Sequence, residues 1–296
     1  MSYLIYRVVE KACIKTYTSF QKNEEFFRKR LSYDCLLLGS SRMEHTVNPA
    51  SLDSVLGTHS YNAGADGAQI QEMKMLLEAG IRMHGKPKLA VVSLDLGSLA
   101  VDKTYRFYPI YMPHLDVPEV SASLKEQGFS VGTYRALPFL RLIEMDDYYK
   151  GALLKAVRHE SHPKERFLLR GYEGATNDTV VPEKLQPITP HDEPLNPAGR
   201  QGLHDLIQLC RQQGIRLCLV YSPEFNAYFQ QRVTNSAQVF RFYDSIARAN
   251  SVPFLRNDTL PMCSESRYFA NSTHVNIEGA RVYSAILGGQ LKTLFP

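Results

Sequence analysis

The chain has 296 residues, of which 44% are hydrophobic and 22% charged, and its formal net charge is +4. This length and composition suit one large domain, or a domain with a sizeable insertion. The small positive excess is spread along the chain without a block of Lys and Arg, so nucleic acid is not indicated as a partner. No run of about 18 apolar residues occurs, and we predict no membrane span.

Short apolar runs alternate with longer amphipathic stretches along most of the chain, after residues 1–32, which we expect to form a preceding helix. The predicted strands are the apolar runs at 33–38, 59–62, 89–94, 215–221 and 252–255, which are typical of a parallel sheet buried on both faces. The predicted helices have apolar residues at helical spacing and cover 67–83, 198–213, 228–249 and 277–294. This alternation predicts a doubly wound, flavodoxin-like three-layer α/β sandwich with about five parallel strands.

Residues 100–195 break the alternation. They are rich in Pro and Tyr and contain two apparently helical pieces, around 118–127 and 136–158. We interpret this segment as an insertion after the third strand that shapes a substrate cleft or a lid. An insertion without any role in binding fits the same pattern equally well.

Polar residues that could perform acyl chemistry lie at three points of this pattern. Ser41 follows the first strand behind a glycine, Gly64 follows the second strand, and His274 stands just before the last helix with Asn271 three residues earlier. A serine at the carboxyl edge of the sheet can meet a histidine from the opposite end of the chain. Taken singly, each is as well explained as a helix cap or a turn residue.

Together, Gly39-Ser40-Ser41, Gly64 and Asn271-x-x-His274 resemble the SGNH (GDSL) hydrolase superfamily. In that superfamily the nucleophile lies in a Gly-Asp-Ser block after the first strand, and the base lies in an Asp-x-x-His block near the C-terminus. The resemblance covers residues 33–95 and 198–294. It implies Ser41 as nucleophile and His274 as base, with Asn271 orienting the base, the N–H groups of Ser41 and Gly64 holding the oxyanion, and no cofactor.

Two positions depart from the superfamily. The acid before the histidine is Asn271, which can orient the ring but supplies no negative charge to an imidazolium. In the superfamily a third position offers an Asn donor to the oxyanion, and here Asp95 would occupy it. An ionised carboxylate has the wrong charge beside a developing oxyanion. Asp95 could instead be protonated, orient another group or bind a substrate hydroxyl. Another acid, Glu44 or Glu224, could support His274. Glu224 is also explained as an acid in the first turn of a helix, where the helix dipole favours negative charge.

Arg42 directly follows the predicted nucleophile. The Gly-Ser-Ser-Arg block resembles the version in SGNH proteins of polysaccharide and cell-wall O-acylation, which implies acyl transfer or deacylation on a carbohydrate. For Arg42 itself two roles remain open: contact with the substrate, or an ion pair with a nearby carboxylate. We therefore predict a serine-dependent acyl hydrolase or O-acyltransferase acting on a small-molecule or carbohydrate ester. The alternatives are a catalytically impaired SGNH-like binding module in a glycan- or envelope-modifying assembly, and a flavodoxin-like fold without acyl chemistry.

The remaining residues bear on cofactors and compartment. The five cysteines form no C-x-x-C pair, and we expect free, buried thiols. The histidines lack metal-ligand spacing and no phosphate-binding glycine loop is present, so we predict neither a metal nor a cofactor. The N-terminus does not resemble a signal peptide. The chain as it stands fits the cytoplasm, whereas an export or anchor segment removed from it would place it in the cell envelope. The oligomeric state is left open.

Overall fold

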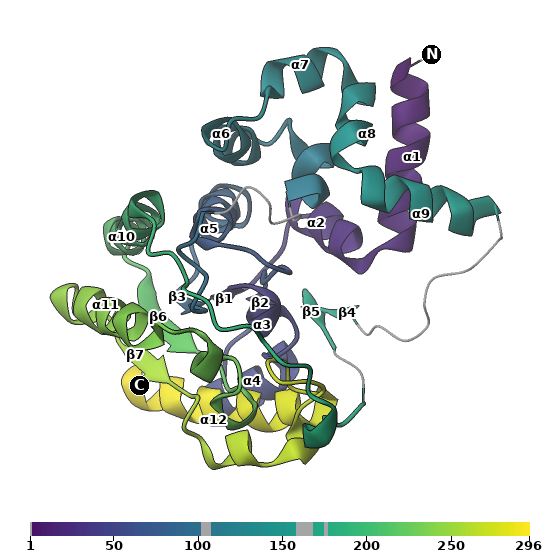
Figure 1. The fold of residues 1–296 in the computed structure, drawn as a ribbon. Coiled ribbons are helices and arrows are strands. Elements are labelled where there is room, and N and C mark those ends of the chain that lie inside the picture. The colour runs from purple at the N-terminus through teal and green to yellow at the C-terminus, as the bar shows by residue number, and fades with distance from the viewer. Residues whose placement is uncertain (1, 102–107, 158–167, 175–176) are drawn as a thin grey trace.

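The computed structural model describes residues 2–101, 108–157, 168–174 and 177–296. At its centre is a five-stranded sheet in the order β2-β1-β3-β6-β7, with every neighbouring pair parallel (Figure 1). The strands are β1 (Cys35–Leu38), β2 (Ser60–Asn62), β3 (Leu89–Ser93), β6 (Arg216–Tyr221) and β7 (Phe254–Arg256). By position along the chain this order is 2-1-3-4-5, the flavodoxin-like one, and the predicted doubly wound α/β class is confirmed.

Both faces of the sheet are covered. Because side chains alternate along a strand, Leu36 and Leu38 of β1 point into one core while Cys35 and Leu37 point into the other. The helices on the first face are α5 (Ile70–His84), α10 (Pro197–Gln213) and α11 (Ser236–Ala249). Those on the second are α4 (Pro49–Leu56) and α12 (Ile277–Leu294). Burial on both faces is why β1, β3 and most of β6 appear in the sequence as apolar runs, whereas the short edge strands β2 and β7 include polar residues.

Further helices lie beyond the first face of the sheet (Figure 1). They are α1 (Ser2–Thr16), α2 (Thr18–Arg28), η1 (Tyr108–His114), α6 (Pro118–Glu126), α7 (Val131–Ala136), η2 (Pro138–Leu140), α8 (Arg141–Glu144) and α9 (Asp146–Val157). The hairpin of β4 (Leu168–Leu169) and β5 (Tyr172–Glu173) and the turn η3 (Pro182–Lys184) complete the segment before α10. Parts of the predicted insertion, 102–107, 158–167 and 175–176, lie outside the described residues.

Three predicted helices differ in the structure. The single helix expected in 1–32 is two helices, because Tyr17 adopts an extended conformation (φ −117°, ψ 130°). The helical piece expected around 136–158 consists of η2, α8 and α9, and Pro138, which lacks an N–H, stands at its start. The helix expected from 228 begins only at Ser236, because Val233 pairs with His191 in an isolated bridge. Short 3₁₀ turns occupy the neighbouring loops: η4 (Phe225–Ala227), η5 (Gln230–Arg232), η6 (Pro261–Ser264) and η7 (Ser266–Tyr268).

Two further predictions concern the cysteines and the absence of a membrane span. All five cysteines are free and buried, as predicted. In the described ranges, no helix combines the length and the apolar character that crossing a membrane requires.

Candidate active site

Ser41 is the first residue of α3 (Ser41–Glu44), a short helix that starts directly after β1. Ser40 caps this helix, and its hydroxyl accepts a hydrogen bond from the backbone N–H of Arg42 at 3.2 Å. Gly39 makes the turn possible, because a Cβ there would lie 2.6 Å from the Cβ of Met43. The backbone N–H of Ser41 falls in the first turn, where no acceptor exists within the helix.

His274 lies directly beside Ser41. Its Nε2 is 2.8 Å from Ser41 Oγ, and its Nδ1 is 3.1 Å from Oδ1 of Asn271. The same oxygen accepts the backbone N–H groups of Thr273 and His274, each at 2.9 Å. Because this oxygen can only accept, Nδ1 carries the ring proton and Nε2 accepts from the serine hydroxyl. The predicted nucleophile, base and orienting group thus lie in the arrangement that acyl transfer would require.

A cavity of about 190 Å³ opens at this pair. Its walls include Gly97, Glu193 and Phe229 beside Ser41 and His274. Among the described lining residues, Glu193 alone comes from the predicted insertion of 100–195. The described part of that insertion therefore leaves the cavity open and contributes one carboxyl group to its wall.

Asp95 and Arg42 form an ion pair at the edge of the cavity. The carboxylate of Asp95 accepts from the hydroxyl of Ser40 and lies 3.4 Å from Nη1 of Arg42. Arg42 is only 4% exposed, lies over the ring of Tyr221 at 4.4 Å, and donates to the carbonyl of Ser222. Asp95 thus orients Ser40 and Arg42, one of the roles left open for it. The pairing of Arg42 with a carboxylate is observed.

The two alternative acids do not contact His274. Glu44 is ion-paired with Lys22 at 2.9 Å, and both side chains are buried. Glu224 is fully buried and accepts the backbone N–H of Gln230 at 3.1 Å. The hypothesis that either acid supports His274 is therefore wrong for this structure, and Glu224 is not accessible to a substrate.

Gly64 packs against the start of α3. Its N–H donates to the side-chain oxygen of Asn62 at 2.9 Å, and a Cβ there would lie 2.7 Å from the backbone nitrogen of Glu44. Its carbonyl accepts from the ammonium of Lys22. With its N–H already bonded, Gly64 does not offer a donor to the oxyanion here, and its small size serves the close packing of this turn on α3.

His45, one helical turn after Ser41, is a second histidine at the site. Its ring centroid is 5.8 Å from that of His274, its Nδ1 donates to the carbonyl of Glu173 at 2.7 Å, and its Nε2 lies 3.3 Å from the carboxylate of Asp66. Burial lowers the pKa of His45, but the hydrogen bond to Asp66 and the charge of Glu44 outweigh burial and raise this pKa to about 9. His45 is therefore an imidazolium at neutral pH.

Glu44, His45 and Asp66 also form a group that could hold a metal ion, with their ligand atoms within 4.8 Å of one another. The ammonium of Lys22 and the proton on His45 already balance the two carboxylates of this group. Charge balance therefore does not require a metal ion, and we assign no chemical step to one.

These charges act on the predicted base. Burial lowers the pKa of His274 to about 4, and the positive charges of His45 and Arg42 act in the same direction. His274 is therefore neutral at physiological pH and can accept a proton. The imidazolium that would form on proton transfer lacks the stabilisation that an acid at position 271 would give.

The sequence analysis missed His45, Asp66, Lys22 and Glu193 as neighbours of the site. His45 had a usable signal, because residues four apart lie on one face of a helix and Ser41 begins that helix. Asp66 also had a signal, because it follows Gly64 by two residues. Lys22 reaches the site from a helix whose position depends on tertiary packing, and no local pattern distinguishes it.

Comparison with known proteins gives loose likenesses only. No family model and no curated protein matches the chain. A putative lipolytic protein of the G-D-S-L family from Desulfitobacterium hafniense is 9% identical, with 87% of this chain and 99% of that one covered and a TM-score of 0.45. A GDSL-like lipase from Bacteroides thetaiotaomicron is 11% identical over 94% and 98%, with a TM-score of 0.47. The acetyl xylan esterase AlAXEase is 9% identical over 90% and 100%, with a TM-score of 0.45. At such scores the activities of these proteins do not transfer to this chain.

Proposed function

We propose that this chain is a serine-dependent acyl hydrolase or O-acyltransferase. The observation that carries the proposal is the 2.8 Å contact between Ser41 Oγ and His274 Nε2. Two residues far apart in the sequence meet at the carboxyl edge of the sheet, and Asn271 holds the histidine in the tautomer that a general base needs. A flavodoxin-like fold without acyl chemistry would leave this alignment unexplained.

In the proposed reaction, Ser41 Oγ attacks the ester carbonyl while its proton passes to Nε2 of His274. Collapse of the tetrahedral intermediate breaks the bond to the leaving alcohol, which takes the proton from His274, and an acyl-serine remains. Water or a sugar hydroxyl then attacks this acyl group, again giving its proton to His274. Release of the acid or of the new ester returns the proton to Ser41.

The oxyanion would be stabilised by groups at the start of α3. The N–H of Ser41 is one donor, because it has no intrahelical partner. The buried guanidinium of Arg42 adds positive charge nearby, and its pairing with Asp95 offsets the unfavourable charge of that carboxylate. This arrangement replaces the Gly and Asn donors that the superfamily resemblance implied.

The cavity supports a small acyl group and a polar acceptor. A volume of about 190 Å³ lies below the range of sites for drug-sized ligands, so an acetyl group suits it better than a long acyl chain. Glu193 and Phe229 in its wall would offer a hydroxyl acceptor and an aromatic face to a sugar. Together with the Gly-Ser-Ser-Arg resemblance, these features favour an O-acetylated carbohydrate as substrate.

The test is release of acetate from acetylated oligosaccharides and from p-nitrophenyl acetate. Ser41→Ala and His274→Ala should each remove the activity, and Ser54→Ala, at an exposed serine on α4, should retain it. Activity that survives Ser41→Ala would contradict the proposal.

A catalytically impaired binding module is the second candidate, and a specific observation favours it. Asn271 gives His274 no negative charge, and the pKa of His274 is lowered to about 4. If this candidate holds, calorimetry with acetylated glycans should show binding to wild type and Ser41→Ala alike, without turnover in either.

A further inference from the structure

Exposed apolar side chains gather on one helical layer of the molecule. Among the described residues, twelve large hydrophobic side chains are more than a third exposed, and nine of these lie on α1 or between residues 137 and 154. Four of the nine are on α1: Tyr3, Leu4, Ile5 and Val8. The other five lie where η2, α8 and α9 follow one another: Leu137, Phe139, Ile143, Leu153 and Leu154. We call these nine residues the apolar face.

The helices that carry the apolar face are neighbours in the fold. Helix α1 packs directly against η2 and α9, and α8 packs against both of them. Leu4 is 68% exposed and Ile143 is 69% exposed, so both side chains extend into solvent. Single exposed apolar residues are normal on a soluble domain, but a contiguous group marks an interaction surface.

The charges beside this face on α1 have one sign. Arg7, Lys11 and Lys15 are exposed. The one acid of the helix, Glu10, is 2% exposed, accepts from the hydroxyl of Tyr6 and pairs with Arg7. The solvent-facing charge of α1 is therefore positive, immediately next to Leu4 and its apolar neighbours.

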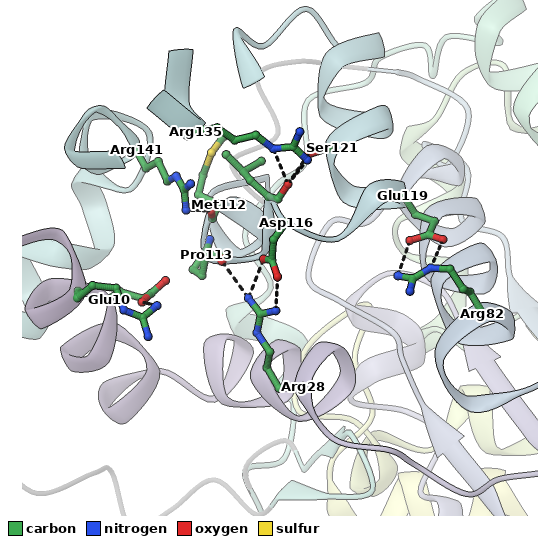
Figure 2. A network of polar contacts seen from close by, with 12 residues as sticks. Glu10, Arg28, Arg82, Met112, Pro113, Asp116, Glu119, Ser121, Arg135 and Arg141 are labelled. Carbon is green, nitrogen blue, oxygen red and sulfur yellow. Dashed lines mark hydrogen bonds and ion pairs between the residues drawn. The ribbon is translucent and has the colours of Figure 1, made fainter. Parts of the chain in front are cut away.

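A groove beside α1 extends the positive surface. It has a volume of about 1040 Å³ and is lined by six cationic side chains and three carboxyl groups. Figure 2 shows Arg28 paired with Asp116, which neutralises it. Arg135 donates to the carbonyl of Leu115, and Arg141 donates to backbone carbonyls of Met112 and Tyr134. A carbonyl orients a guanidinium without cancelling its charge, so the groove keeps a net positive charge.

We propose that α1, η2, α8 and α9 form a peripheral docking surface for a bilayer that contains anionic lipids. Aliphatic side chains next to Lys11 and Lys15, with Tyr3 at the start of α1, match the composition of helices that lie in a membrane interface. On α9, the half-exposed Asp146 is paired with Lys150. The apolar face enters the boundary between headgroups and acyl chains. Lys11, Lys15 and the groove face the lipid phosphates. This surface is separate from Ser41, and the proposal does not depend on acyl chemistry.

The experiment is flotation of the full chain with vesicles. Vesicles of phosphatidylcholine mixed equally with phosphatidylglycerol should bind the chain at least about tenfold more strongly than phosphatidylcholine alone, because each cation near an anionic surface adds attraction. High salt should weaken this binding, since screening shortens the reach of the charges. Failure of the wild-type chain to float with the anionic vesicles would overturn the proposal.

Two double variants measure how much the apolar side chains contribute to vesicle binding. Leu4→Ser with Ile5→Ser should reduce vesicle binding at least about tenfold, because both side chains leave the interface. Val181→Ser with Leu294→Ser is the matched control, since these residues are 44% and 39% exposed but lie outside the apolar face. An equal loss in both pairs would overturn the proposal. All four positions are exposed, so the variants should retain the wild-type thermal transition.

Two further double variants measure how much the positive charges contribute to the preference for anionic vesicles. Lys11→Glu with Lys15→Glu should abolish the preference for anionic vesicles, while Lys86→Glu with Lys184→Glu, at exposed positions elsewhere, should preserve it. Sedimentation of the chain without vesicles tests the alternative that the apolar face pairs with a second copy of the chain. Self-association that Leu4→Ser with Ile5→Ser removes, without vesicle binding by wild type, would show that the face pairs with a second copy.

Discussion

Replacing Asn271 by Asp should strengthen His274 as a base and speed the acylation of Ser41. The Oδ1 of Asn271 lies 3.1 Å from Nδ1 of His274 and accepts two backbone N–H groups at 2.9 Å. An aspartate of the same shape would keep these hydrogen bonds. It would add a negative charge where the structure has only a neutral acceptor.

The size of the effect follows from this distance. An opposite charge within hydrogen-bonding reach moves a pKa by about 1–3 units. The pKa of His274, about 4 in the wild type, should therefore rise to roughly 5–7. Because proton transfer becomes more favourable as the base strengthens, we expect the acylation rate at neutral pH to increase about 10- to 100-fold.

Two measurements check this reasoning. Titration of the histidine ring signals by NMR gives the pKa of His274 directly, and rapid mixing with p-nitrophenyl acetate gives the acylation rate from the burst of p-nitrophenol. Asn271→Ala is the control, and it should slow acylation because the ring loses its orienting acceptor. A raised pKa of His274 in Asn271→Asp without faster acylation would refute the role of His274 as the base.

Three further predictions follow from the charges around the site and in the core. His45→Gln removes a cation beside His274, so the pKa of His274 should rise, and the acidic limb of the acylation profile, near pH 4 in the wild type, should move to higher pH. Lys22→Met leaves Glu44 buried without its partner and should cost about 3–5 kcal/mol in urea unfolding, with partial recovery in the double variant carrying Glu44→Gln. Burial lowers the pKa of His114 to about 3, below its unfolded value of about 6.5, so its stabilising contribution is complete above pH 6.5 and declines toward pH 3. His114→Phe removes this titration. Between pH 6.5 and pH 3 the unfolding free energy of the variant should therefore fall less steeply than that of the wild type, by roughly 1.4 kcal/mol per pH unit. An unchanged slope would contradict the lowered pKa of His114.

The sheet was predictable because its strands are buried on both faces. Residues 35–38, 89–92 and 217–221 are apolar throughout, and such runs separated by amphipathic stretches leave few alternatives to a parallel α/β sheet. Helix interruptions were harder to predict. Tyr17 is a residue that helices tolerate, and only packing between α1 and α9 requires the chain to turn there.

The site was predictable to the extent that each part follows a strand or precedes a helix. Ser41 and His274 had this signal, and the structure brings them together. Asp95 and Gly64 were given roles by resemblance, but their hydrogen bonds go to Ser40, Arg42 and Asn62. A position in a motif does not determine a hydrogen-bond partner, because the partner depends on how separate loops pack.

The exposed face of α1 was beyond the sequence analysis for a different reason. Leu4, Ile5 and Val8 look like core residues of an amphipathic helix, and the pattern does not reveal which stripe is buried. In the structure Tyr6, Val9 and Cys13 occupy the core and the first stripe faces solvent. Which stripe of α1 is buried is thus decided by tertiary packing.

The central claim, that Ser41 is an activated nucleophile, is tested most directly by mass spectrometry after incubation with a fluorophosphonate probe. The account predicts a single adduct on Ser41 in the wild type, lost in Ser41→Ala and His274→Ala and retained in Ser54→Ala. Absence of an adduct on well-folded wild-type protein, or an adduct that persists in His274→Ala, would contradict it.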